Sequence, residues 1–517
     1  MAVTILQWNT RLIFKKLPEF KNYLSDLAFL PDVICIQETH LSPKYNPILP
    51  GYIVIRKDRP PNRGKGGGLA ICVRQSVVHS KIDISPIDSH LEISGIKISG
   101  VSIFNIYNPP SNNFTIEAFD FLSGLKNAVL CGDFNSRHGM WGSQLSNSNG
   151  RNLVGVVEKH DYVILNTAIP THLCLTGHAS WNLLDLTSVS NSLASHCSST
   201  VTNDLLGSDH TVILTEIKGC SPEIAFICST WNFTEANWPL FNKLCDATLT
   251  TFSVNLRYSY QLFETSILDA TSHSIPTTKP WRKPSVPWWK KVCDVAIKNK
   301  KHDYLRMKRT RSTADIIIFK RCRAKARRII LEAKQSSWLK CCISISCNYK
   351  LSMTWKKIKC FSGNRAFLHI PILNTTELPV PTTNTANILA NHFATISAAN
   401  YTQQFSANQH RSLPTLHKAV IETLPKHVRF NANFSLSKVK FGITSTGNTS
   451  PGADNICYEM FKHMSDTSLQ VLLSLYNSIS KSGAIPQSWT HPLVVPIPKP
   501  NKPSYLPSSY RPISLTS

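Results

Sequence analysis

The first 218 residues alternate short apolar runs with polar turns, and this alternation restricts the fold more than any other feature of the chain. The runs are rich in Ile, Val and Leu and have the length of strands, while apolar residues recur at three- and four-residue steps between some of them. The expected strands are Thr4–Trp8, Asp32–Ile36, Tyr52–Ile55, Leu69–Val73, Val101–Tyr107, Ala128–Cys131, Tyr162–Leu165 and Thr211–Ile217, and the expected helices are Lys16–Phe29, Ile116–Leu125 and Asn152–His160. Strands and helices mixed in this way predict a layered α/β domain over residues 1–218.

The rest of the chain divides by composition. Its 517 residues exceed one ordinary core, so two or three domains are expected. Prolines at 276, 280, 284 and 287 indicate a linker over residues 219–287. We expect a basic helical region at 288–360, a loop-rich connector at 361–434 and an incomplete domain at 435–517, which stops without a closing element.

The charge balance predicts a polyanionic partner. Lys and Arg number 56 against 31 Asp and Glu, a formal net charge of +25, and nucleic acid is the commonest partner of such a surface. Basic residues gather between 290 and 340, where apolar residues are interleaved and neither Pro nor Gly occurs. One or two basic amphipathic helices are expected there, binding template RNA, target DNA or both, with an ordinary solvated face as the alternative.

The sequence predicts an intracellular protein with no membrane partner. Residues 1–8 have the pattern of a strand rather than of a signal peptide, and no run has the roughly 20 apolar residues of a membrane span. The 15 cysteines are then expected to be mostly free thiols. The Lys/Arg runs can also serve as a nuclear-import signal, so a nuclear location is expected.

Polar groups able to bind a metal follow two of the apolar runs. Asn9 follows Ile5-Leu6-Gln7-Trp8, and Glu38 follows Val33-Ile34-Cys35-Ile36-Gln37. A carboxylate at the end of a buried strand is costly unless it is paired or binds a cation, and Mg²⁺ favours one or two carboxylates plus water and phosphate oxygens. A solvent-facing Glu38 is the alternative.

Asp133 and Asn135 follow the run Ala128-Val129-Leu130 and, two residues apart on a strand, project to the same face. One acid beside one amide suits the positioning of a water and the stabilisation of a phosphate oxygen. An Asx turn that closes the strand is equally compatible with this pattern.

Three further residues are candidates for phosphate contact. His210, in Ser208-Asp209-His210, could act on a phosphate if a carboxylate fixed its tautomer, and Asp185 is a lone acid in an apolar run. Asp185 could equally cap a helix or end a strand. Tyr107 ends a strand before Asn108-Pro109-Pro110, and its hydroxyl could donate to a phosphate, although an aromatic there is usually core.

Together these blocks, in this order, resemble the exonuclease–endonuclease–phosphatase superfamily, and in particular the apurinic-endonuclease-like domain of non-LTR, jockey-like retrotransposons. The resemblance covers residues 1–218 and implies a four-layer α/β sandwich of two β-sheets flanked by helices. It implies that Asn9 and Glu38 hold Mg²⁺ or Mn²⁺ with help from Asp209. It also implies that Asp133 and Asn135 orient the attacking water and bind the phosphate, that His210 pairs with Asp185 and contacts the scissile phosphate, and that Tyr107 supports that phosphate.

The resemblance implies a function as well. The domain would nick target DNA and leave a 3′-hydroxyl that primes reverse transcription. Repair enzymes of the superfamily usually have an acid where this chain has Arg11, which argues against a strong preference for abasic sites. Two alternatives remain open, a phosphatase or RNA nuclease of the same superfamily and an inactive fragment that only binds nucleic acid.

The C-terminal half resembles the same elements. Four blocks resemble the N-terminal edge of their reverse transcriptase: Ser450-Pro451-Gly452-Ala453-Asp454-Asn455-Ile456, the stretch from Gly483 to Trp489, the stretch from Pro496 to Lys499, and Ser509-Tyr510-Arg511-Pro512-Ile513-Ser514. The paired catalytic aspartates of that polymerase do not occur before Ser517. Because polymerases need carboxylates for two metals, the polymerase part is expected to be incomplete here.

Overall fold

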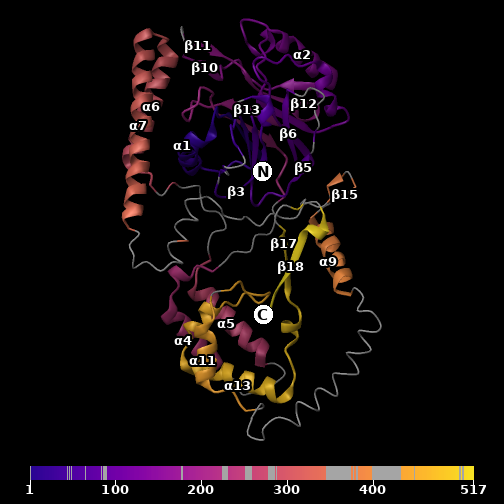
Figure 1. Cartoon of the computed structure of the whole chain (residues 1–517), viewed down its shortest axis with the longest axis vertical. Coiled ribbons are helices and arrows are strands. Elements are labelled where there is room, and N and C mark those ends of the chain that lie inside the picture. Colours follow the sequence, from indigo (N-terminus) through magenta and orange to yellow (C-terminus); the bar gives the residue numbers. More distant parts are fainter. Residues whose placement is uncertain are drawn as a thin grey trace. The chain divides into compact units, whose positions relative to one another are not determined.

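The computed structural model separates the chain into two compact units. One contains Met1–Ile227 with Trp281–His369, and the other contains Cys228–Pro280 with Ile370–Ser517 (Figure 1). The structure describes residues 2–516 apart from 43, 44, 46, 48, 65, 83, 85–89, 176–178, 224–230, 251–258, 278–285, 287, 345–354, 356–373, 377, 380, 381, 399–431, 448, 500, 501 and 503–505.

The first unit is built on two mixed sheets. Among the described residues the first sheet has the order β13 (Cys197–Val201), β14 (Ile213–Lys218), β1 (Ala2–Asn9), β2 (Val33–Gln37), β4 (Leu69–Arg74) and β3 (Tyr52–Lys57). The second has the order β5 (Ser80–Ile82), β6 (Glu92–Ile98), β7 (Val101–Tyr107), β8 (Ala128–Asp133), β12 (Asp185–Ser190) and β9 (Tyr162–Ile164). The pairs β1–β2 and β7–β8 are parallel, and the other pairs are antiparallel.

The two sheets pack face to face because alternate residues of each strand point to opposite sides. In β1, Val3 and Ile5 join a core shared with Ile103 and Val129 of the other sheet. The neighbouring positions in β1 point the other way, and Trp8 packs with residues of α1 (Ile13–Asp26).

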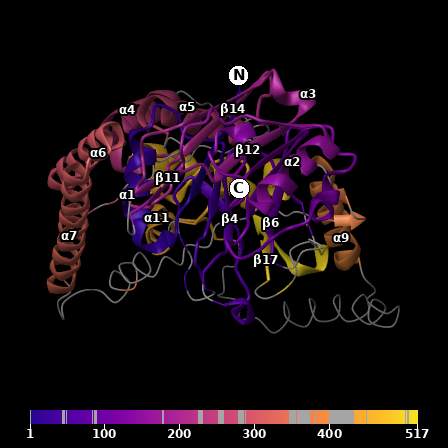
Figure 2. The same cartoon turned by 90° about the horizontal axis from the view of Figure 1, so that it is seen from above.

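The second sheet is covered on its outer face by α2 (Ser148–His160) and the 3₁₀ segment η2 (Ile116–Leu122). In Figures 1 and 2 the strands accordingly lie between α1 on one side and α2 on the other. The layers run helix, sheet, sheet, helix, so the predicted four-layer sandwich is confirmed.

A helical hairpin completes the first unit. Helices α6 (Lys291–Thr310) and α7 (Thr313–Ile343) lie side by side in both views, joined at Arg311 in the left-handed region with φ 54°. Tyr304, Met307 and Phe319 bury against Leu173 and Leu205 of the sandwich. The prediction of a mainly helical basic region after the sandwich is therefore confirmed, and in the structure it forms part of the same compact unit.

The second unit is mainly helical. The helices α4 (Trp238–Leu249), α5 (Ser259–Ser274), α11 (Leu436–Ser445), α12 (Tyr458–Lys462) and α13 (Asp466–Ser482) share one apolar core. A hairpin of β17 (Leu493–Pro498) and β18 (Tyr510–Leu515) contains the Pro496 and Arg511 blocks of the sequence. The expected connector at 361–434 lies mostly outside the described residues, which include β15 (Asn374–Thr376), β16 (Leu378–Pro379) and α9 (Thr382–Ala398).

The segment 219–287 differs from the linker that the sequence predicted. It contains α4 and α5, which belong to the core of the second unit. Pro239 stands in the first turn of α4, where a missing N–H costs nothing, and Asn237 caps the helix by accepting from the amide of Leu240 at 3.2 Å. The linker that the prolines of this segment predicted is therefore wrong over α4 and α5.

Several strands of the sandwich were also missed, among them β6, β13, β10 (His172–Cys174) and β11 (Ser180–Asn182). β13 is an edge strand with the polar sequence Cys-Ser-Ser-Thr-Val, and β10 and β11 are only three residues long, so neither hydrophobicity nor length marks them. Among the described residues no helix combines the length and the hydrophobicity that a membrane crossing requires.

Candidate active site

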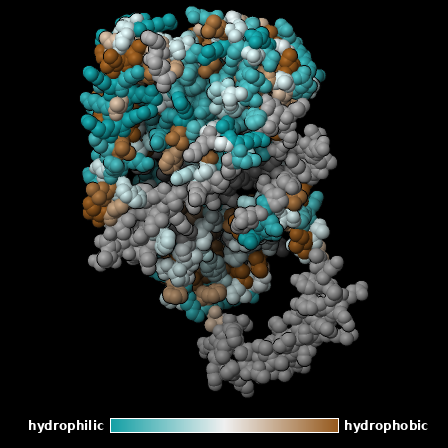
Figure 3. Space-filling model, turned by 45° about the horizontal axis from the view of Figure 1, so that its top comes forward, coloured by the Kyte–Doolittle hydropathy of each residue, from teal (hydrophilic) through white to brown (hydrophobic). Residues whose placement is uncertain are grey.

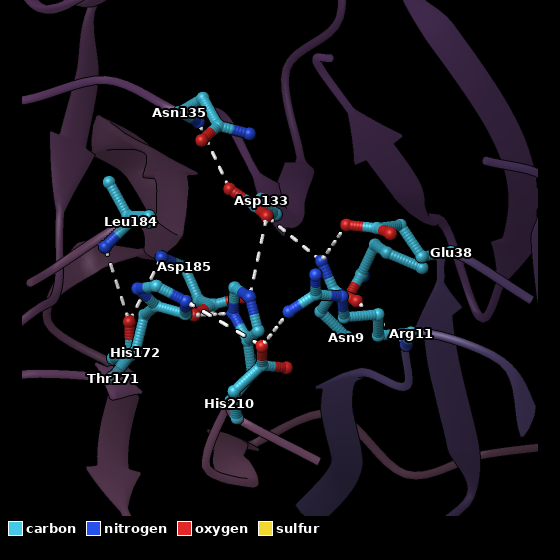
Figure 4. Close-up of polar contacts among 12 residues, drawn as sticks. Asn9, Arg11, Glu38, Asp133, Asn135, Thr171, His172, Leu184, Asp185 and His210 are labelled. Carbon is cyan, nitrogen blue, oxygen red and sulfur yellow. Dashed lines mark hydrogen bonds and ion pairs between the residues drawn. The ribbon is translucent and has the colours of Figure 1, made fainter. Parts of the chain in front are cut away.

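The polar blocks of the sequence meet at one edge of the sandwich (Figure 4). Asn9 ends β1 and Glu38 follows β2 in one sheet, while Tyr107 ends β7 and Asp133 ends β8 in the other. The parallel pairing brings each of these ends to the same edge, as open α/β sheets do. Asp185 begins antiparallel β12 opposite Asp133, so it reaches that edge from the other direction.

Two close approaches fix the sheets to each other beneath the site. The side chain of Gln7 donates to the carbonyl of Gly132 at 3.0 Å, and Gln37 donates to the side chain of Asn105 at 2.6 Å. A Cβ at position 132 would lie 2.1 Å from the carbonyl oxygen of Ile106, so only glycine fits between Cys131 and Asp133.

His210 and Asp185 form a buried pair. Nδ1 of His210 lies 2.7 Å from Oδ2 of Asp185, and their side chains are 6% and 1% exposed. Burial opposes the charge on His210, but Asp185, together with Asp133 and Asp209, outweighs it and raises the pKa of His210 to about 9. Because Nδ1 is held by Asp185, Nε2 is left to face Asp133, whose Oδ2 lies 4.0 Å away. The pairing that the sequence predicted is therefore present.

Asn9 links the two sheets through their carboxylates. Its Nδ2 donates to Oε1 of Glu38 at 3.0 Å and to Oδ2 of Asp133 at 2.9 Å. Burial alone would raise the pKa of Glu38, but hydrogen bonds with His40 and Asn9 lower it. Burial raises the pKa of Asp133 to about 8, together with the nearby charges of Asp185 and Glu38. Negative charge is thus crowded at the point where Asn9 sits.

The other predicted residues border this centre. Tyr107 is 4% exposed, and burial raises the pKa of its hydroxyl, as do the charges of Glu38 and Asp133. Asn135 has a positive φ of 48°, and its backbone N–H donates to Oδ1 of Asp133 at 3.0 Å. The side chain of Asn135 donates to the carbonyl of Asn108 at 2.8 Å, so in this structure it is directed away from Asp133.

Asp209 lies at the rim and is engaged by Arg11. The two side chains form an ion pair, and Nε2 of His172 is 3.9 Å from the same carboxylate. Burial opposes the charge of Asp209, but His210 and Arg11 lower its pKa to about 2. Arg11 therefore neutralises Asp209, the acid to which the family resemblance gives a role in metal binding.

Two residues of the site were missed in the sequence. The hydroxyl of Thr171 accepts from the backbone amides of Leu184 at 3.2 Å and Asp185 at 3.1 Å. The ring of His172 lies 4.5 Å from that of His210, and burial, with His210, lowers the pKa of His172 to about 4. The adjacent Thr171-His172 pair before apolar Leu173 was the available signal, but the contacts themselves depend on folding.

The cluster has the donor set of a metal site. Ligand atoms of Asp133, Asp185 and His210 lie within 4.8 Å of one another, and all three residues are buried. Oδ1 of Asp185 is buried and has no hydrogen-bond partner among the residues that the structure describes, and the carboxylate of Glu38 stands across Asn9. Such a concentration of buried oxygen ligands could bind a metal ion, because a cation offsets the cost of burying them.

Comparisons with known proteins agree with this description. A family model described as endonuclease-reverse transcriptase matches residues 101–214. A probable RNA-directed DNA polymerase from transposon BS of Drosophila melanogaster is 24% identical, over 99% of this chain and 57% of that protein. The RNA-directed DNA polymerase from mobile element jockey of the same species is 28% identical, over 32% of this chain and 18% of that protein.

Among solved structures, the endonuclease domain of TRAS1, a telomere-specific non-LTR retrotransposon, is 19% identical with a TM-score of 0.35, over 42% of this chain and 98% of that domain. The chain spans only 57% of the length of the transposon BS protein and of the similar X-element protein of Drosophila melanogaster.

The two six-stranded sheets with their flanking helices, and the polar cluster at one edge, agree with the sandwich that the sequence blocks predicted. Over residues 101–214 the chain is similar to the endonuclease–reverse transcriptase family, and over most of its length it is similar to the polymerase proteins of Drosophila transposons. The predicted resemblance is therefore confirmed.

Proposed function

We propose that the first domain, residues 1–218, is a divalent-metal-dependent endonuclease that nicks one strand of target DNA and leaves a 3′-hydroxyl for reverse transcription. The observation that carries this proposal is the meeting of Asn9, Glu38, Asp133, Asp185 and His210 at one buried edge of the sandwich. We also propose that residues 435–517 are the front part of a reverse transcriptase domain.

His210 acts on the phosphate. Asp185 holds its Nδ1 at 2.7 Å and keeps the ring protonated at neutral pH, so Nε2–H is free to donate to a phosphoryl oxygen. The negative charge that develops on that oxygen during attack is then stabilised by the buried, protonated ring of His210. Tyr107 donates its hydroxyl to the same phosphate from the neighbouring strand, because its raised pKa keeps it protonated.

Asp133 orients the attacking water. Its Oδ1 is fixed by the backbone N–H of Asn135, which leaves Oδ2 directed between Asn9 and His210. A water held there by Asp133 is placed for in-line attack, and Asp133 accepts its proton when ionised, a form that predominates above its pKa of about 8. As the water oxygen bonds to phosphorus, the bond from phosphorus to the 3′ oxygen breaks, and that oxygen takes a proton from solvent to give the 3′-hydroxyl. Asn135 contributes its side chain to the phosphate only after it leaves the carbonyl of Asn108.

The metal is assigned to the Glu38 side of the cluster rather than to the His210 side. A cation between Asp185 and His210 would break an ionic hydrogen bond of 2.7 Å. A cation beside Glu38 leaves that pair intact, but it requires the amide of Asn9 to turn over and give up its bonds to Glu38, Asp133 and the N–H of Arg11. Glu38 and Asn9 would hold Mg²⁺ or Mn²⁺ there, and the ion would supply neutralisation of the negative charge of the phosphate. Asp209 assists it only if Arg11 is displaced.

Nicking of supercoiled plasmid by the full chain, with Mg²⁺ or with a chelator, tests the proposal. Asp133→Asn should slow nicking at least about 100-fold, while relief of buried charge should leave the variant folded. Asp120→Asn is the matched control, since Asp120 is 41% exposed and pairs with Lys159 on the outer surface. Nicking by Asp133→Asn at the rate of the control would contradict the proposal.

Two further experiments distinguish a DNA endonuclease from an RNA nuclease or a phosphatase. Single-stranded RNA and inositol phosphates, offered under the same conditions, should be turned over far more slowly than duplex DNA. Extension of the nicked plasmid by an added DNA polymerase should occur without end repair, because the nick carries a 3′-hydroxyl. Template RNA as a partner of the basic region 290–340 and a nuclear location remain parts of this proposal.

A further inference from the structure

A basic groove opens beside the active site within the first unit. It has a volume of about 680 Å³ and runs between the start of α1 and one face of α7. Six of its lining residues are cationic, namely Arg11, Lys15, Lys16, Arg323, Arg327 and Lys334. Two are acidic, Glu19 and Asp209.

The groove has a defined shape because the hairpin is anchored to the sandwich. Phe319 of α7 is 1% exposed in the apolar cluster with Leu173 and Leu205. Lys301 of α6 pairs with Asp204 at 2.9 Å, and Arg323 donates to the carbonyl of Gly207 at 3.3 Å. Figure 3 shows hydrophilic side chains along the left edge of its upper part, where α6 and α7 lie.

The cations of α7 that line the groove share one face of the helix. Arg323, Arg327 and Lys334 are four and seven residues apart in sequence, which returns each to the same side of a helix with about 100° per residue. Arg321 and Lys325 lie roughly 120° to 160° around the helix from Arg327 by the same periodicity. They are exposed and are not among the residues that line the groove.

The two acids of the groove leave most of its positive charge uncompensated, because Asp209 neutralises only Arg11. Glu19 is engaged by Lys300, and Asp209 is engaged by Arg11. Burial lowers the pKa of Lys16 to about 8, and Arg323, Arg327 and Arg11 add to this effect. Crowded cations of this kind are stabilised by an anion placed among them.

We propose that this groove binds the sugar–phosphate backbone of the DNA strand that is cut, on one side of the scissile phosphate. The groove is continuous with the site, since Arg11 and Asp209 line it and Asp209 also approaches His172. Phe14 and Leu331, which are 51% and 53% exposed in the groove, offer apolar surface to the sugars between phosphates. The choice of DNA over RNA rests on the proposed nuclease function.

Equilibrium binding of a labelled DNA duplex to the full chain, in EDTA so that nothing is cut, tests the groove. The groove variant is Arg327→Gln with Lys334→Gln, and the matched control is Arg321→Gln with Lys325→Gln. Both remove two charges from exposed positions of α7, and Gln retains the helix. The groove variant should lower the slope of log affinity against log salt by about 1.8 and weaken binding at 0.1 M salt by roughly 10- to 60-fold. The control should change binding less than about threefold.

Equal losses in the two variants would overturn the proposal, because net charge alone would then explain binding. A groove variant that loses affinity for single-stranded RNA and keeps its affinity for DNA would also overturn it. The nuclease proposal is judged separately by plasmid nicking, where the groove variant should raise KM and leave kcat at saturating DNA unchanged. A protein that binds DNA selectively through the groove but does not nick it would contradict the nuclease proposal and leave the groove proposal intact.

Discussion

Replacement of Asp185 by Asn tests the buried pair at the centre of the site. Burial lowers the pKa of His210, whose side chain is only 6% exposed, but Asp185, with Asp133 and Asp209, raises it from 6.5 to about 9. A folded pKa above the unfolded value stabilises the protein fully below pH 6.5, and this stabilisation is lost as the pH rises through 9. At 1.36 kcal/mol per unit, protonation of His210 in its folded surroundings contributes about 3 kcal/mol at pH 6 and almost nothing at pH 9.5.

Asp185→Asn keeps the volume and removes the charge, so the pKa of His210 should fall towards its ordinary value. Urea unfolding in EDTA at pH 6 and pH 9.5 measures the effect. The free energy of unfolding of Asp185→Asn should fall by about 3 kcal/mol more at pH 6 than at pH 9.5. That of Asp120→Asn should fall by less than about 0.5 kcal/mol at both pH values. Equal losses for Asp185→Asn at the two pH values would refute an ionic pair.

Three further predictions concern packing and the metal. Gly132→Ala should destabilise the first unit by about 3 kcal/mol or more, because the added Cβ would meet the carbonyl of Ile106 at 2.1 Å. Thermal melting measures this loss, and an unchanged melting temperature would contradict the close approach. Mg²⁺ at 100 times its Kd should raise the free energy of unfolding of the wild type by about 2.7 kcal/mol, and Glu38→Gln should abolish that increase. A Glu38→Gln protein that Mg²⁺ stabilises as much as the wild type would place the cation elsewhere. Phe319→Ala should cost about 3–5 kcal/mol and expose α7 to limited proteolysis, because Phe319 is 1% exposed beneath the hairpin; protection equal to that of the wild type would argue against this anchor.

The strands that position the site could be predicted because their sequence signal is local. Buried runs such as the one before Asp133 contain β-branched residues and end in polar groups, so both the strand and its functional end are visible. The order of such ends along the chain then carried the family resemblance. Asp185 is the instructive case, since its isolation in an apolar run pointed to a buried partner, and the partner is His210.

What escaped prediction depends on contacts between distant segments. His172 joins the site through an isolated bridge between β10 and His210, which no local pattern encodes. The amphipathic character of α6 and α7 was visible, but their docking required Leu173 and Leu205 to form the other half of the cluster. The engagement of Asp209 by Arg11 likewise joins residues 198 positions apart.

The position of the catalytic cation is the most direct test of the account. A crystal structure of the full chain with Mn²⁺ and a short DNA duplex would locate the metal by anomalous scattering. We expect one peak bound by Glu38 and a phosphate oxygen, with His210 still hydrogen-bonded to Asp185 and facing the scissile phosphate. A cation inserted between His210 and Asp185, or a phosphate bound away from this edge, would contradict the account.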